Sequence, residues 1–243
     1  MAGRELPPSS PFAGDGGTAD PRVAAALDAL GSGTGSVSDV VDALHGTRVL
    51  VPVLAELEVA DVVVHDGHAH TVDKEASAGI VALRAPDGRT ALPVFTSVAT
   101  MTAWRSDARP VPSDIARAAL SAVTEGWEVV VVDPGGPTTV LLPRPAVWAL
   151  AQQTRWVPAV GPDGVDDEVR AAIVASVVPV RGVVAVDAVA GTRAEVAVLV
   201  DLVPGLDRAG LDSVLRGVND ALATVELVAA RVDSIEIRPR AAR

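Results

Sequence analysis

The chain has 243 residues, of which 49% are hydrophobic and 21% charged, and its formal net charge is −11 at neutral pH. An apolar fraction of this size can form a packed core, which excludes global disorder. The sequence contains no cysteine, which excludes disulfides, cysteine zinc sites, thiolate nucleophiles and iron–sulfur clusters. The 31 acidic residues outnumber the 20 basic ones in both halves, so we expect no nucleic-acid partner.

The mean hydropathy of +0.35 is high for a protein outside membranes. The longest uncharged apolar stretch, Ala171–Val180, has only ten residues. A membrane-spanning helix needs about 20. The first residues also lack the apolar region of a signal peptide. We therefore predict a cytoplasmic protein without membrane contact.

Residues 1–19 are rich in Pro, Ser and Gly and predict a disordered tail. Residues 20–157 predict an N-terminal unit in which short helices and strands alternate. Its helices are expected to begin after the N-cap residues Asp20, Ser36, Ser97 and Ser113, and a further helix covers Pro143–Gln153. The predicted strands are Arg48–Val59, Gly79–Arg84, Thr90–Val94, Trp127–Val132 and Thr138–Leu142.

The segment Pro158–Gly164 (PAVGPDG) predicts an interdomain linker, because it is rich in Pro and Gly and has no periodicity. Residues 165–240 predict a second unit with the order α-β-β-α-β. Its elements are a helix over Asp166–Val178, strands over Val183–Ala188 and Ala194–Leu202, a helix capped by Asp207, and a strand over Val232–Ile237. The inward stripe of the Asp207 helix is Leu211, Leu215, Val218, Leu222 and Val225.

One face of this three-stranded sheet is expected to lie open, because the stripe covers only the other. The open face would carry Val183, Ala185, Ala197 and Leu199, which are small or apolar. The preceding helix, the N-terminal unit or a second chain must then cover it. We favour an interdomain contact or a homodimer, since two-fold symmetry needs only one self-complementary patch.

The most metal-like segment contains His65, His68 and His70, with Asp73 and Glu75 close behind. Imidazoles at this spacing, helped by carboxylates, could hold Zn or Ni. A glycine lies inside the run, and a specific metal site needs a rigid second shell. We therefore favour a solvated loop and predict no metal and no cofactor.

A glycine-rich segment, Gly31–Gly35, resembles a phosphate-binding loop in composition. The dinucleotide-binding fingerprint requires a preceding strand and a glycine at its sixth position. Here a helix is predicted to precede the segment, and Ser36 occupies the sixth position. The segment is therefore interpreted as a linker between two helices.

The most suggestive binding residues surround the predicted hairpin and the helix that begins after Ser97. A helix start leaves N–H groups that can bind an anion. The same residues also have an account without a ligand, which we favour: Gly88 makes the turn, Phe95 anchors the core and Ser97 caps the helix. Trp104 and Trp148 are expected in the core or at a domain interface. The candidate binding residues are Asp87, Arg89, Phe95, Thr96, Ser97, Trp104 and Arg105.

Several segments between Arg48 and Gln152 resemble the N-terminal domain of the SseB family, and of actinobacterial members most. They are Leu50–Val53 (LVPV), Ala85–Arg89 (APDGR), Leu92–Ser97 (LPVFTS), Trp104, Asp107–Pro112 (DARPVP), Asp133–Pro137 (DPGGP) and Pro143–Pro145 (PRP). Residues 166–238 look like the C-terminal half of such proteins. The resemblance implies the two-unit layout but no established activity and no catalytic residues.

The predicted fold class is α+β, with two compact units of mostly antiparallel sheets and helices on their faces. The predicted function is that of a non-enzymatic protein-binding or adaptor module. The alternative is a sensor of a small ligand, an amino acid or an anion, near Ser97. An enzyme ranks third because the usual nucleophile and cofactor motifs are absent, although carboxylates alone can catalyse some reactions. A pocket lined by Arg89, Thr96 or Arg105 would favour the sensor, and a flat apolar patch the adaptor.

Overall fold

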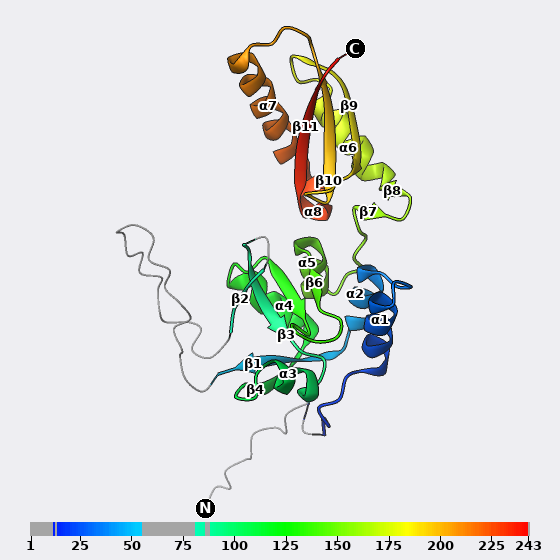
Figure 1. Cartoon of the computed structure of the whole chain (residues 1–243), viewed down its shortest axis with the longest axis vertical. Coiled ribbons are helices and arrows are strands. Elements are labelled where there is room, and N and C mark those ends of the chain that lie inside the picture. The colour runs from blue at the N-terminus through cyan, green and yellow to red at the C-terminus, as the bar shows by residue number, and fades with distance from the viewer. Residues whose placement is uncertain (1–11, 13, 55–80, 86–87, 243) are drawn as a thin grey trace, which may run out of the picture. The chain divides into compact units, whose positions relative to one another are not determined.

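The computed structural model describes residues 12, 14–54, 81–85 and 88–242 (Figure 1). The chain divides into two compact units between Arg155 and Trp156. Both units combine helices with sheets, and most strand pairs are antiparallel. The predicted α+β class is therefore confirmed.

The N-terminal unit contains five helices and six strands among its described residues. The helices are α1 (Pro21–Gly31), α2 (Val37–Leu44), α3 (Val98–Trp104), α4 (Ile115–Thr124) and α5 (Arg144–Gln152). The strands are β1 (Arg48–Val53), β2 (Leu83–Arg84), β3 (Thr90–Val94), β4 (Arg109–Asp114), β5 (Val129–Val132) and β6 (Val140–Leu142). β1 pairs with β4, and the main sheet has the order β2-β3-β5-β6, in which only β3 and β5 are parallel.

Local sequence signals explain most helix starts in this unit. Asp20, Ser36 and Ser97 each accept a hydrogen bond from the first turn of their helix, as predicted. The predicted cap of α4 is wrong by one residue: the Asp114 carboxylate accepts the N–H of Ala116. Ser113 lies in β4 instead, because the preceding segment pairs with β1 and continues as a strand to Asp114.

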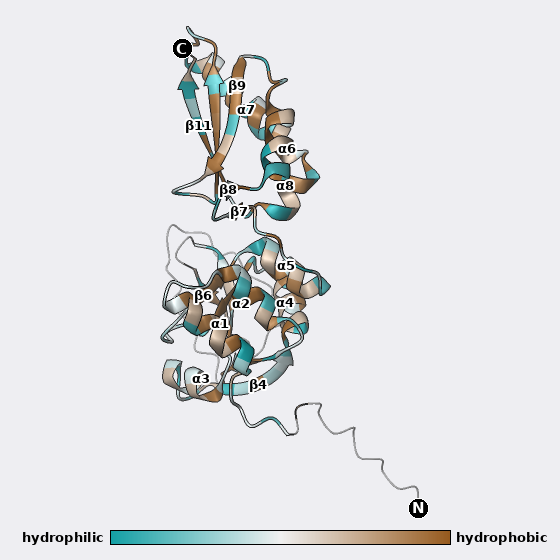
Figure 2. Cartoon of the chain, turned by 90° about the vertical axis from the view of Figure 1, so that its right-hand side faces the viewer, coloured by the Kyte–Doolittle hydropathy of each residue, from teal (hydrophilic) through white to brown (hydrophobic). Residues whose placement is uncertain are grey.

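The core of the unit forms around β5, whose four valines are all buried. A continuous run of valines is typical of a strand buried on both faces, and this prediction is confirmed. The helices α4 and α5 pack against each other, and both contact β5 (Figures 1 and 2). The predicted hairpin joins β2 to β3, and Gly88 takes the positive φ of 87° that its turn requires.

The C-terminal unit contains the predicted α-β-β-α-β series and three further short elements. Its elements are β7 (Val160–Gly161), β8 (Gly164–Val165), α6 (Asp167–Val177), β9 (Val183–Ala190), β10 (Val196–Leu202), α7 (Arg208–Ala223), α8 (Glu226–Arg231) and β11 (Ile235–Ala241). The main sheet has the order β11-β10-β9; β10 is antiparallel to β9 and parallel to β11. The helices α6, α7 and α8 lie on one side of it (Figure 2).

The segment predicted as a linker, Pro158–Gly164, belongs to this unit. Val160 and Gly161 pair with Val165 and Gly164 as the hairpin β7–β8. Ala159 is fully buried in the core of the unit. Glycine and proline therefore mark a tight hairpin here, and the exposed connection between the units lies just before it, at residues 152–155.

The helix-covered face of the sheet carries Val196, Val198, Val200 and Leu202 of β10, as predicted. Within α7, Val218 and Leu222 are buried as expected, but Val214 is buried in place of the half-buried Leu215. On the opposite face the prediction is confirmed for Ala185, Ala197 and Leu199 and is wrong for Val183. A bulge shifts the register between Asp201 and Leu202, so Val183 lies opposite Leu202 on the helix side. The open face instead carries Ala185, Asp187, Val189, Ala197, Leu199, Asp201, Glu236, Arg238 and Arg240.

Candidate functional site

A buried polar cluster lies where β3 and β5 end. Because these strands are parallel, their carboxyl ends meet, and the residues that follow them become neighbours. The Asp133 carboxylate, after β5, accepts the backbone N–H of Thr96 at 2.8 Å and its hydroxyl at 2.7 Å. The hydroxyl of Thr100 donates to the same carboxylate at 3.0 Å. Asp133 is only 3% exposed, and these three donors satisfy the buried oxygens of its side chain.

The backbone of Asp133 is held as firmly as its side chain. Its φ of 47° lies in the left-handed region, which aspartate tolerates better than most residues. Its N–H donates to the carbonyl of Val94, and its own carbonyl accepts the Gly136 N–H and the Thr139 hydroxyl. The turn after β5 is therefore a fixed corner that points one carboxylate at the start of α3.

At Ser97, where the alternative account places an anion, several backbone donors are bonded within the protein. The Thr96 N–H is bonded to Asp133, and the Thr100 N–H donates to the Ser97 hydroxyl at 3.1 Å. The N–H of Val98 donates to the carbonyl of Gly17 at 2.8 Å. Asp133, Ser97 and Gly17 are therefore the acceptors for these three N–H groups.

Arg48 fastens the N-terminal segment to the same corner. Its guanidinium donates to the Thr96 carbonyl at 2.8 Å, and to the Asp15 carboxylate and the Thr18 carbonyl at 2.7 Å each. Burial would raise the pKa of Asp15, but the hydrogen bonds from Arg48 and Gly17 outweigh it and hold that pKa below its usual value. Residues 14–19, predicted as part of a disordered tail, are therefore tied to the unit; residues 1–11 and 13 lie outside the described residues.

Phe95 and Trp104 form the apolar floor beside this cluster. Their ring centroids are 5.2 Å apart, with planes tilted by 37°. Together with Leu50 and Met101 they form a small core cluster. Both aromatic residues therefore serve packing, as the account without a ligand predicted.

The structure brings Phe95, Thr96, Ser97 and Trp104 together but not the other predicted residues. Arg89 lies at the opposite end of β3, with its Nε 3.9 Å from Glu128. Arg105 follows the last turn of α3 and pairs with Asp107 at 2.8 Å. Asp87 lies outside the described residues, as do His65, His68 and His70.

Sequence reasoning missed Asp133, Thr100 and Arg48 as members of the cluster. The one available signal was Asp133 itself, an acidic residue directly after a buried strand and before Pro-Gly-Gly. Its partners could not be found in this way, because the parallel pairing of β3 and β5 joins segments far apart in the sequence.

An exposed apolar surface lies on the outer side of α4 and α5. Leu120 of α4 is 53% exposed and Trp148 of α5 is 43% exposed. The opposite sides of both helices are buried, for example at Ala119 and Leu150. Trp148, expected in the core or at an interface, is therefore not in the core. We call the exposed residues of these helices the α4–α5 face: Arg117, Leu120, Ser121, Thr124, Trp148 and Gln152.

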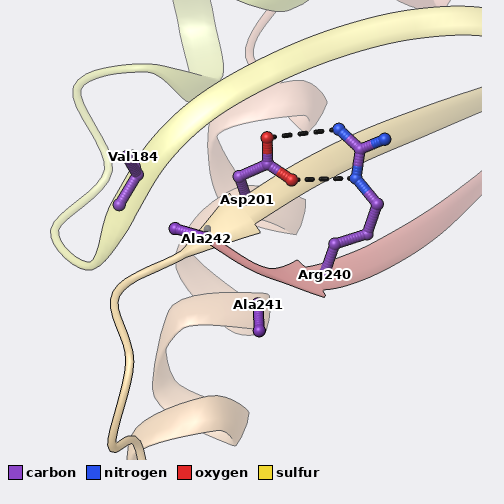
Figure 3. Close-up of a pocket in the computed structure, with 5 residues that line it drawn as sticks. All are labelled: Val184, Asp201, Arg240, Ala241 and Ala242. Atoms are coloured by element: carbon purple, nitrogen blue, oxygen red, sulfur yellow. Dashed lines mark hydrogen bonds and ion pairs between the residues drawn. The ribbon is translucent and has the colours of Figure 1, made fainter.

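The C-terminal unit has a cavity of about 520 Å³ at the carboxyl ends of β10 and β11 (Figure 3). Asp201 and Arg240 form a two-point ion pair across the strands, at 2.8 and 3.2 Å. Val184, at the bulge of β9, lines the cavity with Ala241 and Ala242. Ligands of α/β sheets are often bound at this end of parallel strands.

No group of three or more His, Asp or Glu side chains among the described residues is placed to hold a metal ion. Among the same residues, no helix is both long and apolar enough to cross a bilayer.

The protein is of the α+β class, and the sequence motifs between Arg48 and Gln152 lie in its N-terminal unit. A family model of the SseB protein N-terminal domain matches residues 23–149, just over half of the chain. The chain therefore belongs to the SseB family, which confirms the resemblance of its motifs. The matched range includes Thr96, Asp133 and Trp148. No curated protein and no solved structure matches the chain.

Proposed function

We propose that this protein is a non-enzymatic protein-binding module and that the α4–α5 face is its docking surface. The observation that carries the proposal is the exposure of Trp148. The chain has only four Trp, two Phe and no Tyr, and one of these scarce aromatic side chains is left 43% exposed. Leu120, 53% exposed on the neighbouring helix α4, is the second large apolar side chain that these two helices expose.

An exposed indole is well suited to anchor a partner. Covering the exposed part of Trp148 would remove roughly 100 Å² of apolar surface from water, worth about 2–3 kcal/mol. Tryptophan is also among the residues most often found at the energetic centre of protein interfaces. A few such contacts are enough for specific binding without any cavity or cofactor.

The polar cluster at the ends of β3 and β5 supports a structural role over a catalytic one. A general acid or base must reach a substrate with a proton or a free lone pair. Asp133 is 3% exposed and already accepts three hydrogen bonds from Thr96 and Thr100. A carboxylate in this setting positions the start of α3.

The proposal can be tested by capture followed by reconstitution. Tagged wild-type protein, Trp148→Ala and Val111→Ala would be compared in native lysate; Val111 lies on β4 and is 45% exposed, which matches Trp148. We expect a protein that is retained by the wild type and by Val111→Ala, lost with Trp148→Ala, and bound again when both purified components are mixed. Equal retention by all three variants would contradict the proposal.

A small-ligand sensor is the second candidate, and the cavity at Asp201 and Arg240 favours it. Its volume of about 520 Å³ lies within the range of small-molecule sites. Thermal unfolding in the presence of pooled metabolite fractions would test this function. A fraction that raises the Tm of the wild type but not of Arg240→Ala would support the sensor, and no shift with any fraction would contradict it.

A further inference from the structure

The α4–α5 face has a charge opposite to that of the whole chain. The helices α4 and α5 comprise 10 and nine residues, with the sequences IARAALSAVT and RPAVWALAQ. At the average of 31 acidic residues in 243, about two or three acidic residues would be expected in such a length, and there are none. The charged residues of the two helices are Arg117, which is exposed, and Arg144, which is half-buried.

Along the chain, the acidic residues nearest to α4 are at its two ends. The side chain of Asp114 is used as the N-cap of the helix and accepts the N–H of Ala116 at 2.8 Å. Glu125 is the C-cap residue, beyond the last turn. The α4–α5 face therefore combines two large apolar side chains and three uncharged polar ones with a single charged residue, Arg117.

We propose that the α4–α5 face binds an acidic amphipathic helix of a partner protein; this inference rests on the proposed function. Leu120 and Trp148 would receive the apolar stripe of the partner helix, and Arg117 would face its carboxylates. Backbone groups within α4 and α5 are bonded inside each helix, so this face has no strand edge to extend. Docking must use side chains, and a helix presents apolar and acidic side chains on adjacent faces.

A second copy of this chain fits the face less well. In a two-fold dimer the same patch meets itself, so the interface would hold two copies of Arg117 and no acidic residue of α4 or α5. Like charges brought together in a partly desolvated interface weaken the association. An acidic partner removes this repulsion and also gains from long-range attraction at low salt.

Two synthetic helical peptides would test the charge preference directly. Both carry the same leucine stripe; the polar positions are Glu in the acidic probe and Lys in the basic probe. Fluorescence anisotropy of the labelled probes would be measured with the full chain at low and high salt. We expect binding of the acidic probe to be at least about tenfold tighter than that of the basic probe, and to weaken with salt.

Three variants test whether the acidic probe binds at the α4–α5 face. Trp148→Ala should weaken binding of the acidic probe by about tenfold or more, and Arg117→Glu by about fivefold or more while improving that of the basic probe. Arg208→Glu makes the same charge change on an exposed residue of α7 and should leave both affinities unchanged.

The outcomes separate this proposal from the proposed function. If both probes bind with equal affinity and Trp148→Ala abolishes the binding of both, the α4–α5 face remains the docking surface, but the preference for acidic partners is overturned. Binding of the acidic probe that Trp148→Ala leaves intact would overturn both. No binding of the acidic probe overturns this inference. A rise in mass with concentration that Trp148→Ala abolishes would assign the face to a second copy.

Discussion

The carboxylate of Asp133 accepts both the backbone N–H and the hydroxyl of Thr96, at 2.8 and 2.7 Å, although the two residues are 37 positions apart. This pair joins the turn after β5 to the start of α3. Both residues are buried, so the pair satisfies the polar groups of Thr96 away from solvent. The corner is therefore a structural joint of the N-terminal unit.

Asp133→Ala should destabilise the N-terminal unit by about 2–4 kcal/mol, because it leaves the buried donors of Thr96 and Thr100 without their acceptor. Asp133→Asn should cost less, since asparagine keeps one acceptor oxygen and tolerates the left-handed backbone. Urea unfolding measures both, with the exposed Asp212→Ala on α7 as the control. A loss for Asp133→Ala no larger than for Asp212→Ala would show that the network contributes little.

Arg48→Ala should release the N-terminal segment from the corner. The guanidinium holds Asp15 and Thr18, and the neighbouring Gly17 carbonyl accepts the N–H of Val98. We expect hydrogen exchange at the Val98 amide to speed up by at least about tenfold, because its acceptor is no longer fixed. Arg208→Ala on α7 is the control, and unchanged protection of Val98 in Arg48→Ala would argue against the anchoring role.

Glu195 gives the C-terminal unit a dependence on pH. Burial raises the pKa of Glu195 above its usual value, although its carboxylate accepts the N–H of Asp233 at 2.7 Å. Because the native pKa is higher than the unfolded one, the native state holds the proton of Glu195 more tightly than the unfolded state does. The contribution of Glu195 to the free energy of unfolding is therefore greatest below the unfolded pKa, and it is lost as the pH rises through the native pKa. Glu195→Gln should therefore gain Tm relative to the wild type between pH 4 and pH 8.

Thermal unfolding at several pH values measures this difference. Asp220→Asn is the control, because Asp220 is an exposed carboxylate on α7. A gap between Glu195→Gln and the wild type that stays constant from pH 4 to pH 8 would exclude burial of this charge as the cause.

Limited proteolysis should locate the connection between the units at residues 152–155, which are exposed. The segment 158–164 should resist cleavage, because the Pro158 carbonyl accepts a hydrogen bond from Arg231 and Ala159 is buried. A protease of broad specificity with mass spectrometry of the early fragments distinguishes the two sites. Early cleavage within 158–164 would show that the β7–β8 hairpin opens readily.

The open sheet face of the C-terminal unit should not hold a stable homodimer. Three strands about 4.8 Å apart and seven residues long cover roughly 300 Å², well below the ~800 Å² per partner of a stable interface. Its charges are also already paired, as in Arg240–Asp201 and Arg238–Glu236. Light scattering at micromolar concentration should give a mass near 24.7 kDa. A doubled mass that Leu199→Lys halves would restore the homodimer expected from the sequence.

Both edge strands of this sheet, β9 and β11, have features that disfavour pairing with a strand of another chain. The N–H of Ala242 donates to the carbonyl of Leu202 in β10, and the backbone N–H groups of a strand point alternately to its two sides. The N–H position of residue 239 therefore points away from β10, at the outer edge of β11, where a proline has no donor to lose. At β9, the Ala188 N–H is taken by the Asp187 carboxylate, which also binds Arg170. Both devices oppose edge-to-edge pairing with another chain.

The sequence determined the features that depend on residues close together in the chain. The caps at Asp20, Ser36 and Ser97 and the buried run of β5 follow from hydrogen-bonding types and periodicity within a few residues. The family motifs are likewise short local segments, and they were sufficient to identify the SseB family. Phe95, Thr96 and Ser97 at the corner were found because a helix start is a local signal.

Only the tertiary structure decided which distant residues meet. Parallel pairing of β3 with β5 brings Asp133 to Thr96, and a single bulge moves Val183 to the covered side of its sheet. The exposure of Trp148 was equally beyond the sequence, since an apolar residue on a helix is buried or exposed according to which elements pack around it. Strand register and packing arise from many weak contacts between segments far apart in the chain, so no local pattern carries them.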